Sequence, residues 1–128
     1  MAHGTARIGR DRYRTEIEVS GHALVADEGA GLGGANTGPA PYDYILAGLG
    51  ACTAITLRMY ADRKEWPLES ADVDLRLVGG KEGAHIERTL TLTGALDQEQ
   101  RARLADIAER TPVTLTLKNG IGITTTLA

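Results

Sequence analysis

Apolar and polar residues alternate along two segments of the chain, as they do in half-buried β-strands. From residue 12 to 26 the alternation is interrupted once, at Ser20 and Gly21, where a tight turn fits. From residue 72 to 92 it is interrupted by the glycine-rich stretch 79–83. The pattern predicts two antiparallel hairpins.

A long helix is predicted between these hairpins. Residues 27–41 are rich in glycine, alanine and asparagine and contain two prolines, a composition that favours a loop. From residue 42 to 64 apolar residues instead recur every three or four positions, which predicts the helix. Gly48 and Gly50 each weaken it by about 1 kcal/mol relative to alanine. They indicate close approach of another segment or a ligand just before Cys52, or simply tight helix packing.

The last third of the chain predicts a second, shorter helix and then two strands. Asp97 and Gln100 have the spacing of a capping box, and a narrow apolar stripe follows them. Residues 113–117 and 121–127 alternate again on either side of Asn119-Gly120, which is typical of a type I′ hairpin.

Length, composition and charge fit one small soluble domain. The chain has 128 residues, and its order of strands and helices favours an α+β fold in which residues 1–128 form a single domain. The net charge of −3 is small and mixed, so neither nucleic acid nor a membrane surface is an expected partner. No segment approaches the roughly 18 apolar residues that span a bilayer, and no export signal is evident, which predicts a cytoplasmic protein.

Few residues point to a metal or a cofactor. The stretch from Gly29 to Gly34 matches the spacing of a dinucleotide-binding loop, but no helix is predicted to begin at these glycines. His22 and His85 lie on predicted strands without a second ligand at metal-binding spacing. We therefore expect no metal site and no cofactor.

Cys52 is the only cysteine, so the chain can form no internal disulfide, and a reducing compartment is the natural interpretation. It shares an apolar stripe with Ile45 and Leu49, where a cysteine can simply pack as a small hydrophobic residue. A reactive Cys52 would instead need a nearby cation, because it is about ten residues from the positive end of the helix. The remaining candidates are the N-terminal arginines Arg7, Arg10, Arg12 and Arg14.

The run from Gly38 to Thr53, GPAPYDYILAGLGACT, resembles the signature of the OsmC/Ohr family. The preceding Ala26-Asp27-Glu28 and Gly33-Gly34 are also similar to the family. The resemblance implies an OsmC-like fold, in which antiparallel strands accompany a long central helix carrying Cys52 and a second shorter helix. It further implies an intertwined homodimer with active sites at the subunit interface. There the helical cysteine reduces organic hydroperoxides and a second cysteine resolves the product.

The chain departs from the family pattern at two positions. The resolving cysteine of the family corresponds to Thr111, and the glutamate that orients the family's arginine corresponds to Tyr42, next to Asp43. The resemblance places that arginine at Arg10, with Arg12 as the next choice. It therefore implies a one-cysteine member in which an external thiol reduces the oxidised cysteine.

Two functions are compatible with these residues. In the first, the protein is a redox enzyme of oxidative stress defence, and an organic hydroperoxide oxidises Cys52. Arg10 stabilises the thiolate, and Asp43 or Tyr42 orients that arginine. The residues assigned to substrate contact are Tyr42, Leu49 and Thr111. In the second, it is a noncatalytic small-molecule-binding or stress-associated protein in which Cys52 only packs.

Overall fold

The computed structural model describes residues 2–80 and 83–128. The chain forms two compact units, Met1–Ile45 and Leu46–Ala128. The expectation that residues 1–128 make a single domain stays a prediction.

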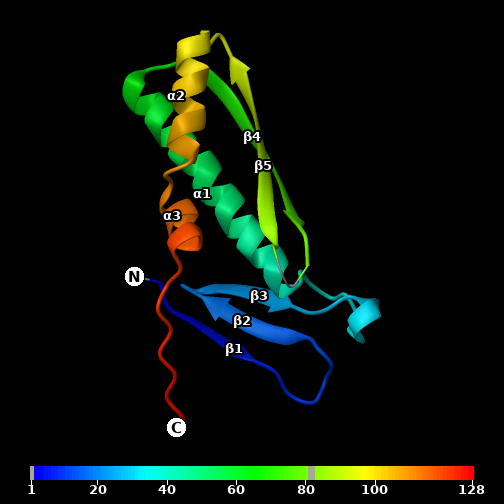
Figure 1. Cartoon of the computed structure of the whole chain (residues 1–128). Helices are drawn as coiled ribbons and strands as arrows, with labels where there is room; N and C mark the ends of the chain where they lie inside the picture. The colour runs from blue at the N-terminus through cyan, green and yellow to red at the C-terminus, as the bar shows by residue number, and fades with distance from the viewer. Residues whose placement is uncertain (1, 81–82) are drawn as a thin grey trace. The chain divides into compact units, whose positions relative to one another are not determined.

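The first unit is built on a three-stranded antiparallel sheet (Figure 1). Its strands are β1 (Gly4–Arg7), β2 (Thr15–Val19) and β3 (His22–Ala26), in the order β1-β2-β3. The predicted hairpin is confirmed, and Ser20 and Gly21 both have the positive φ of a tight hairpin turn. Strand β1 was not predicted, because its residues are all exposed and show no apolar alternation. Pairing with β2, and not local sequence, makes it a strand.

The glycine-rich loop predicted after β3 is confirmed. It contains one turn of 3₁₀ helix, η1 (Ala30–Leu32), and no α-helix begins at its described glycines. The loop therefore lacks the helix N-terminus that a bound pyrophosphate would need. The hydroxyl of Tyr44 donates a hydrogen bond of 2.5 Å to the carbonyl of Val25, which ties the start of the next helix to β3.

Helix α1 (Pro41–Lys64) confirms the predicted long helix. The carboxylate of Asp43 accepts a hydrogen bond of 2.9 Å from the amide of Ala40, and its charge lies near the positive end of the helix dipole. Buried residues recur at every fourth position, so one narrow face of the helix enters the core. They are Leu49, Thr53, Leu57 and Ala61.

By length and composition alone α1 could cross a membrane, which contradicts the expectation that no segment approaches that requirement. One such helix is weak grounds for a membrane span, because core helices of soluble proteins meet the same criteria. Leu57 and Ala61 of α1 are fully buried inside the second unit. On this face, the apolar residues of the helix serve packing inside the second unit.

The second unit packs α1 with a long hairpin and a second helix (Figure 1). The hairpin consists of β4 (Leu68–Val78) and β5 (His85–Gly94), and the helix is α2 (Gln98–Ala108). Both predictions are confirmed. The capping box is present, since Asp97 accepts from the amide of Gln100 and the Gln100 side chain accepts from the amide of Asp97. The core of the unit contains Leu57, Ala61, Leu68, Leu96, Leu104 and Ala108.

The two glycines of α1 have different surroundings. A Cβ added to Gly50 would lie 2.7 Å from Cδ1 of Leu75, so the hairpin approaches the helix closely at this point. Among the described residues, nothing lies within 4 Å of a Cβ added to Gly48. Tight helix packing therefore accounts for Gly50, and it does not account for Gly48.

The predicted C-terminal hairpin is wrong. Residues 113–117 belong to helix α3 (Pro112–Asn119), which begins at Pro112, where a missing amide proton costs nothing. Gly120 has a φ of 80° and ends this helix, so the predicted turn is a helix stop. Residues 121–128 pair with no strand in the described chain, and a strand forms only where its backbone groups find partners.

Candidate functional site

Cys52 lies in the middle of α1, beside the buried face of the helix. Its thiol is free and the residue is partly buried. Leu49 and Thr53 on the adjoining face are 5% and 0% exposed. Cys52 is therefore at the edge of the core and is not sealed inside it. No group of three or more metal-binding side chains occurs among the described residues.

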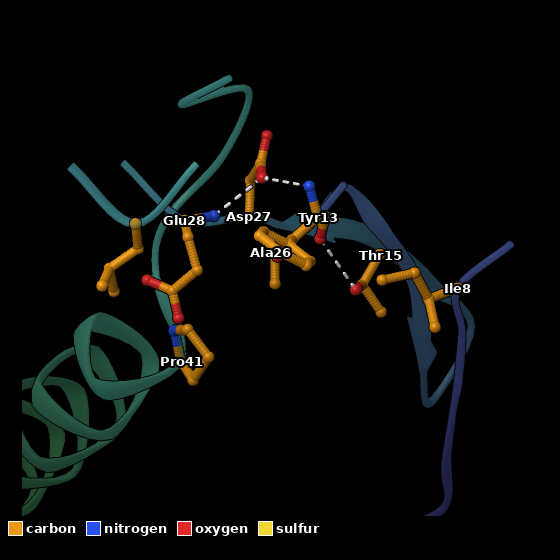
Figure 2. Close-up of a pocket in the computed structure, with 8 residues that line it drawn as sticks. Ile8, Tyr13, Thr15, Ala26, Asp27, Glu28 and Pro41 are labelled. Carbon is orange, nitrogen blue, oxygen red and sulfur yellow. Dashed lines mark hydrogen bonds between the residues drawn. The ribbon is translucent and has the colours of Figure 1, made fainter. Parts of the chain in front are cut away.

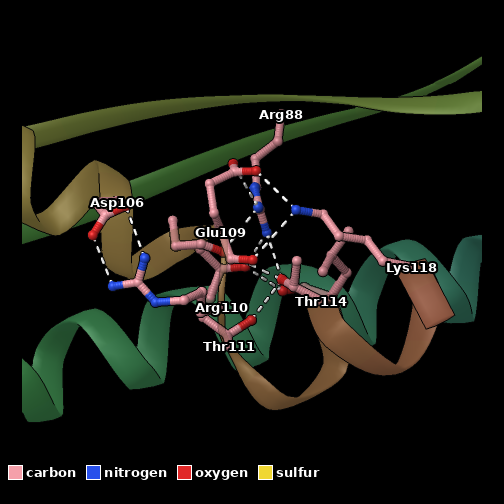
Figure 3. Close-up of polar contacts among 10 residues, drawn as sticks. Arg88, Asp106, Glu109, Arg110, Thr111, Thr114 and Lys118 are labelled. Carbon is pink, nitrogen blue, oxygen red and sulfur yellow. Dashed lines mark hydrogen bonds and ion pairs between the residues drawn. The ribbon is translucent and has the colours of Figure 1, made fainter.

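Thr53 is held by Arg88 of β5, whose side chain is only 11% exposed. Nη1 of Arg88 donates to the hydroxyl oxygens of Thr53 and Thr114, at 3.0 Å each. Nη2 donates to the carbonyl of Ala108 at 2.9 Å and to the carboxylate of Glu109 at 3.3 Å. We call Arg88 and these four partners the Arg88 cluster, part of which is labelled in Figure 3.

Thr111, at the position expected for a resolving cysteine, also lies at this cluster (Figure 3). Thr111 is 1% exposed, and its hydroxyl oxygen is 2.6 Å from the hydroxyl oxygen of Thr114. Thr53 in turn donates to the carbonyl of Leu49 at 2.7 Å. Hydrogen bonds therefore run from the turn of α1 that carries Cys52, through Arg88, to the start of α3.

Both terminal nitrogens of the Arg88 guanidinium are engaged. Its two terminal nitrogens have four acceptors between them, and arginine remains charged when it is buried. Glu109 supplies the opposite charge and also accepts from Lys118 at 2.9 Å. Hydrogen bonds from Lys118 and then Arg88 hold the pKa of Glu109 below its ordinary value. The cluster is thus a closed structural group, and the cation for a reactive thiol must be sought elsewhere.

Arg88 was not among the site residues predicted from the sequence, although a signal was present. Arg88 occupies a position in β5 that would otherwise continue the apolar alternation of Ile86, Leu90 and Leu92. An arginine on the inward face of a strand indicates a buried partner for its charge. The partners themselves come from three other segments, so the sequence could not identify them.

The other predicted site residues, Arg10, Tyr42 and Asp43, belong to the first unit. Arg10 is exposed in the loop between β1 and β2, and within the described part of the chain it forms no ion pair. Tyr42 is 64% exposed on the first turn of α1. The carboxylate of Asp43 already caps that helix. Leu49, Cys52 and Thr111 belong to the second unit.

Asp27 is a further polar centre of the first unit. The residue is 2% exposed, and hydrogen bonds, above all from the hydroxyl and amide of Thr37, hold the pKa of its carboxyl well below the usual range. It lies beside an open pocket of about 360 Å³, shown in Figure 2. The apolar part of the wall includes Ile8, Leu32 and Pro41.

These features define a class, a small α+β protein with one cysteine on a long central helix. The family model for OsmC-like proteins matches residues 33–126, and the chain belongs to this family. The predicted membership of the OsmC/Ohr family and the predicted α+β, OsmC-like fold are both confirmed.

Solved structures share the fold. The OsmC-like protein from Mycoplasma pneumoniae is 16% identical, with a TM-score of 0.80 over 93% of this chain and 88% of that chain. An organic hydroperoxide resistance protein OsmC from Legionella pneumophila is 24% identical, with a TM-score of 0.68 over 93% and 90%. The organic hydroperoxide resistance protein OhrB of Bacillus subtilis is 25% identical, with a TM-score of 0.59 over 93% and 92%. The curated proteins contain no significant match to the chain.

Proposed function

We propose that the protein is a cytoplasmic one-cysteine thiol peroxidase, which reduces organic hydroperoxides and contributes to oxidative stress defence. The observation that carries this proposal is the state of Cys52, the only cysteine, which is free and partly exposed on α1. The similar structures from Bacillus subtilis and Legionella pneumophila are organic hydroperoxide resistance proteins, which supports the substrate class. No metal or cofactor takes part in this chemistry.

The reaction needs only the thiolate and an external thiol. The sulfur of Cys52 attacks the terminal peroxide oxygen, the O–O bond breaks, and the alkoxide leaves with a proton as the alcohol. A first external thiol then attacks the sulfenic acid and releases water, forming a mixed disulfide with Cys52. A second external thiol releases Cys52 and leaves as the disulfide. Because Thr111 has no sulfur, the chain itself cannot attack the sulfenic acid to form an internal disulfide, and the first external thiol takes that step.

Arg10 is the proposed cation of the site. A thiolate is stabilised by a nearby positive charge, and Arg10 is exposed and without an ion pair in the described chain, whereas Arg88 is paired with Glu109 and both its terminal nitrogens are hydrogen-bonded. Asp43 or Tyr42 is proposed to orient it. Tyr42 is exposed and is proposed to contact the hydroperoxide. Leu49 and Thr111 are buried, and we propose that they form the floor of the substrate site.

The reduced protein is expected to gain one oxygen atom within seconds of exposure to cumene hydroperoxide, because a free thiolate forms a sulfenic acid. Intact-mass spectrometry measures the adduct, and dithiothreitol should remove it. Cys52→Ser is the matched control and should gain no oxygen. An unmodified wild type with a full thiol titre would contradict the proposal and favour a noncatalytic binding protein.

A homodimer is the proposed assembly. Residues 121–128 pair with no strand in the described chain, yet Ile121, Ile123 and Leu127 are 73%, 86% and 96% exposed. On α1, Ile55 and Met59 are 54% and 60% exposed. Apolar exposure of this kind marks a surface that another chain covers. A second copy of this chain is the proposed partner.

Light scattering on a sizing column should give twice the mass of one chain for the wild type. Replacing Ile121 and Ile123 together by serine should convert the protein to a monomer. Serine removes the alternating apolar side chains of this segment, which the partner is proposed to cover. The control replaces Thr124 and Thr126 together by serine and should remain dimeric. A monomeric wild type would contradict the assembly without bearing on the oxidation of Cys52.

A further inference from the structure

The carboxylate of Asp27 is a buried group outside the Arg88 cluster whose two oxygens both accept hydrogen bonds, and the proposed chemistry does not use it. Its Oδ1 accepts from the amide of Tyr13 at 3.1 Å and from the amide of Glu28 at 2.7 Å. Its Oδ2 accepts from the amide of Thr37 at 3.0 Å and from the hydroxyl of Thr37 at 2.6 Å. Figure 2 shows the bonds to Tyr13 and Glu28.

These donors come from segments that are far apart in the sequence. Tyr13 is at the end of the exposed loop between β1 and β2, whereas Thr37 is at the end of the glycine-rich loop. The amide of Asp27 itself donates to the carbonyl of Pro39 at 3.1 Å. Asp27 is therefore the residue at which the two loops are joined.

The loop between β1 and β2 has few other anchors. In the described part of the chain, the amide of Tyr13 makes the one backbone hydrogen bond that ties residues 8–13 to a segment beyond the adjoining strand β2, whose Thr15 hydroxyl donates to the carbonyl of Tyr13 at 3.1 Å. Ordering a residue of flexible chain costs about 1–2 kcal/mol in conformational entropy, so an untethered loop samples many positions. Arg10 is three residues from Tyr13 in this loop. Motion of the loop backbone therefore also moves the guanidinium of Arg10.

We propose that Asp27 is a positioning residue for Arg10, which it holds in place by fixing the loop between β1 and β2 through the amide of Tyr13. This inference rests on the proposed function, in which Arg10 stabilises the thiolate of Cys52. Hydrogen bonds to an ionised acceptor are shorter and stronger than neutral ones, which suits a carboxylate as the anchor. Asp27 stays ionised at neutral pH, because its hydrogen bonds keep the pKa of the carboxyl low.

A double-mutant cycle on the rate of Cys52 oxidation by cumene hydroperoxide tests this role. Arg10→Ala should lower the second-order rate constant by about 100-fold, the effect typical of removing one preorganised stabilising group. Asp27→Asn should lower it by about tenfold, because a misplaced group loses part of its effect. In the Arg10→Ala background, Asp27→Asn should change the rate by less than about twofold, since coupled residues are not additive.

Two further variants cover the case in which Asp27→Asn fails to fold. Thr37→Val removes the hydroxyl that donates to Asp27 and should slow oxidation by about threefold, whereas Thr37→Ser keeps the donor and should restore the rate. Glu18 has an exposed carboxylate on β2, so Glu18→Gln is the matched control and should react like the wild type.

The outcomes separate the two proposals. A wild type that is not oxidised overturns the proposed function and the positioning role together. A wild type that reacts, with Asp27→Asn and Thr37→Val at the same rate, overturns only the positioning role. Equal losses from Asp27→Asn in the presence and absence of Arg10, or no loss from Arg10→Ala, likewise overturn it.

Discussion

Replacing Arg88 by methionine is expected to lower the free energy of unfolding by about 3 kcal/mol or more, because it breaks a buried, charged hydrogen-bond network. The guanidinium donates to Thr53, Thr114, the carbonyl of Ala108 and Glu109. Methionine fills a similar volume but donates nothing, so the carbonyl and the two hydroxyl oxygens lose a donor where little water reaches them.

Urea unfolding followed by circular dichroism measures this loss. The matched control is Arg76→Met on the neighbouring strand, where the arginine pairs with Asp74 at 3.3 Å and both side chains are well exposed. Exposed pairs contribute little, so the control should stay within about 0.5 kcal/mol of the wild type. Equal stability of the two variants would show that the Arg88 cluster contributes no more than a surface pair.

Replacing Leu57 by alanine is expected to cost about 3–4 kcal/mol, through lost burial and the cavity left behind. Leu57 is 0% exposed in the centre of the second unit's core, and it lies on the same helix as Cys52. Neighbouring elements can close such a cavity only in part, because the core is packed from α1, β4 and α2 together.

The same urea titration compares this variant with Leu32→Ala. Leu32 is 70% exposed in the glycine-rich loop, so its replacement should cost less than about 1 kcal/mol. A small loss from Leu57→Ala would mean that the core repacks around α1. In that case the position of Cys52 would be less firmly held than the buried face of the helix indicates.

Elements with a local signal were predictable. The three-and-four-residue spacing of α1, the capping box of Asp97 and Gln100, and the alternation of the two hairpins each lie within a short window. Cys52 was likewise placed on its helix by the run around it. The long helix and the position of the thiol on it can therefore be predicted from the sequence alone.

Elements that depend on distant partners were not predictable. Strand β1 has no apolar pattern and exists because β2 pairs with it. Residues 113–117 alternate like a strand, yet they form α3, since a two-residue period sets a strand only when a partner is available. The alternation of residues 121–127 finds no such partner within the described chain.

The sequence alone determined the family, the long helix and the position of the single cysteine on it, because these follow from local pattern and from one continuous motif. Only the tertiary structure decided that Arg88 is hydrogen-bonded within its own cluster, that Thr111 is buried beside Thr114, and that Asp27 accepts a hydrogen bond from the amide of Tyr13, in the loop that carries Arg10. Each of these facts depends on hydrogen bonds between segments far apart in the chain. Burial makes such bonds obligatory, but the sequence does not say which partners will satisfy them.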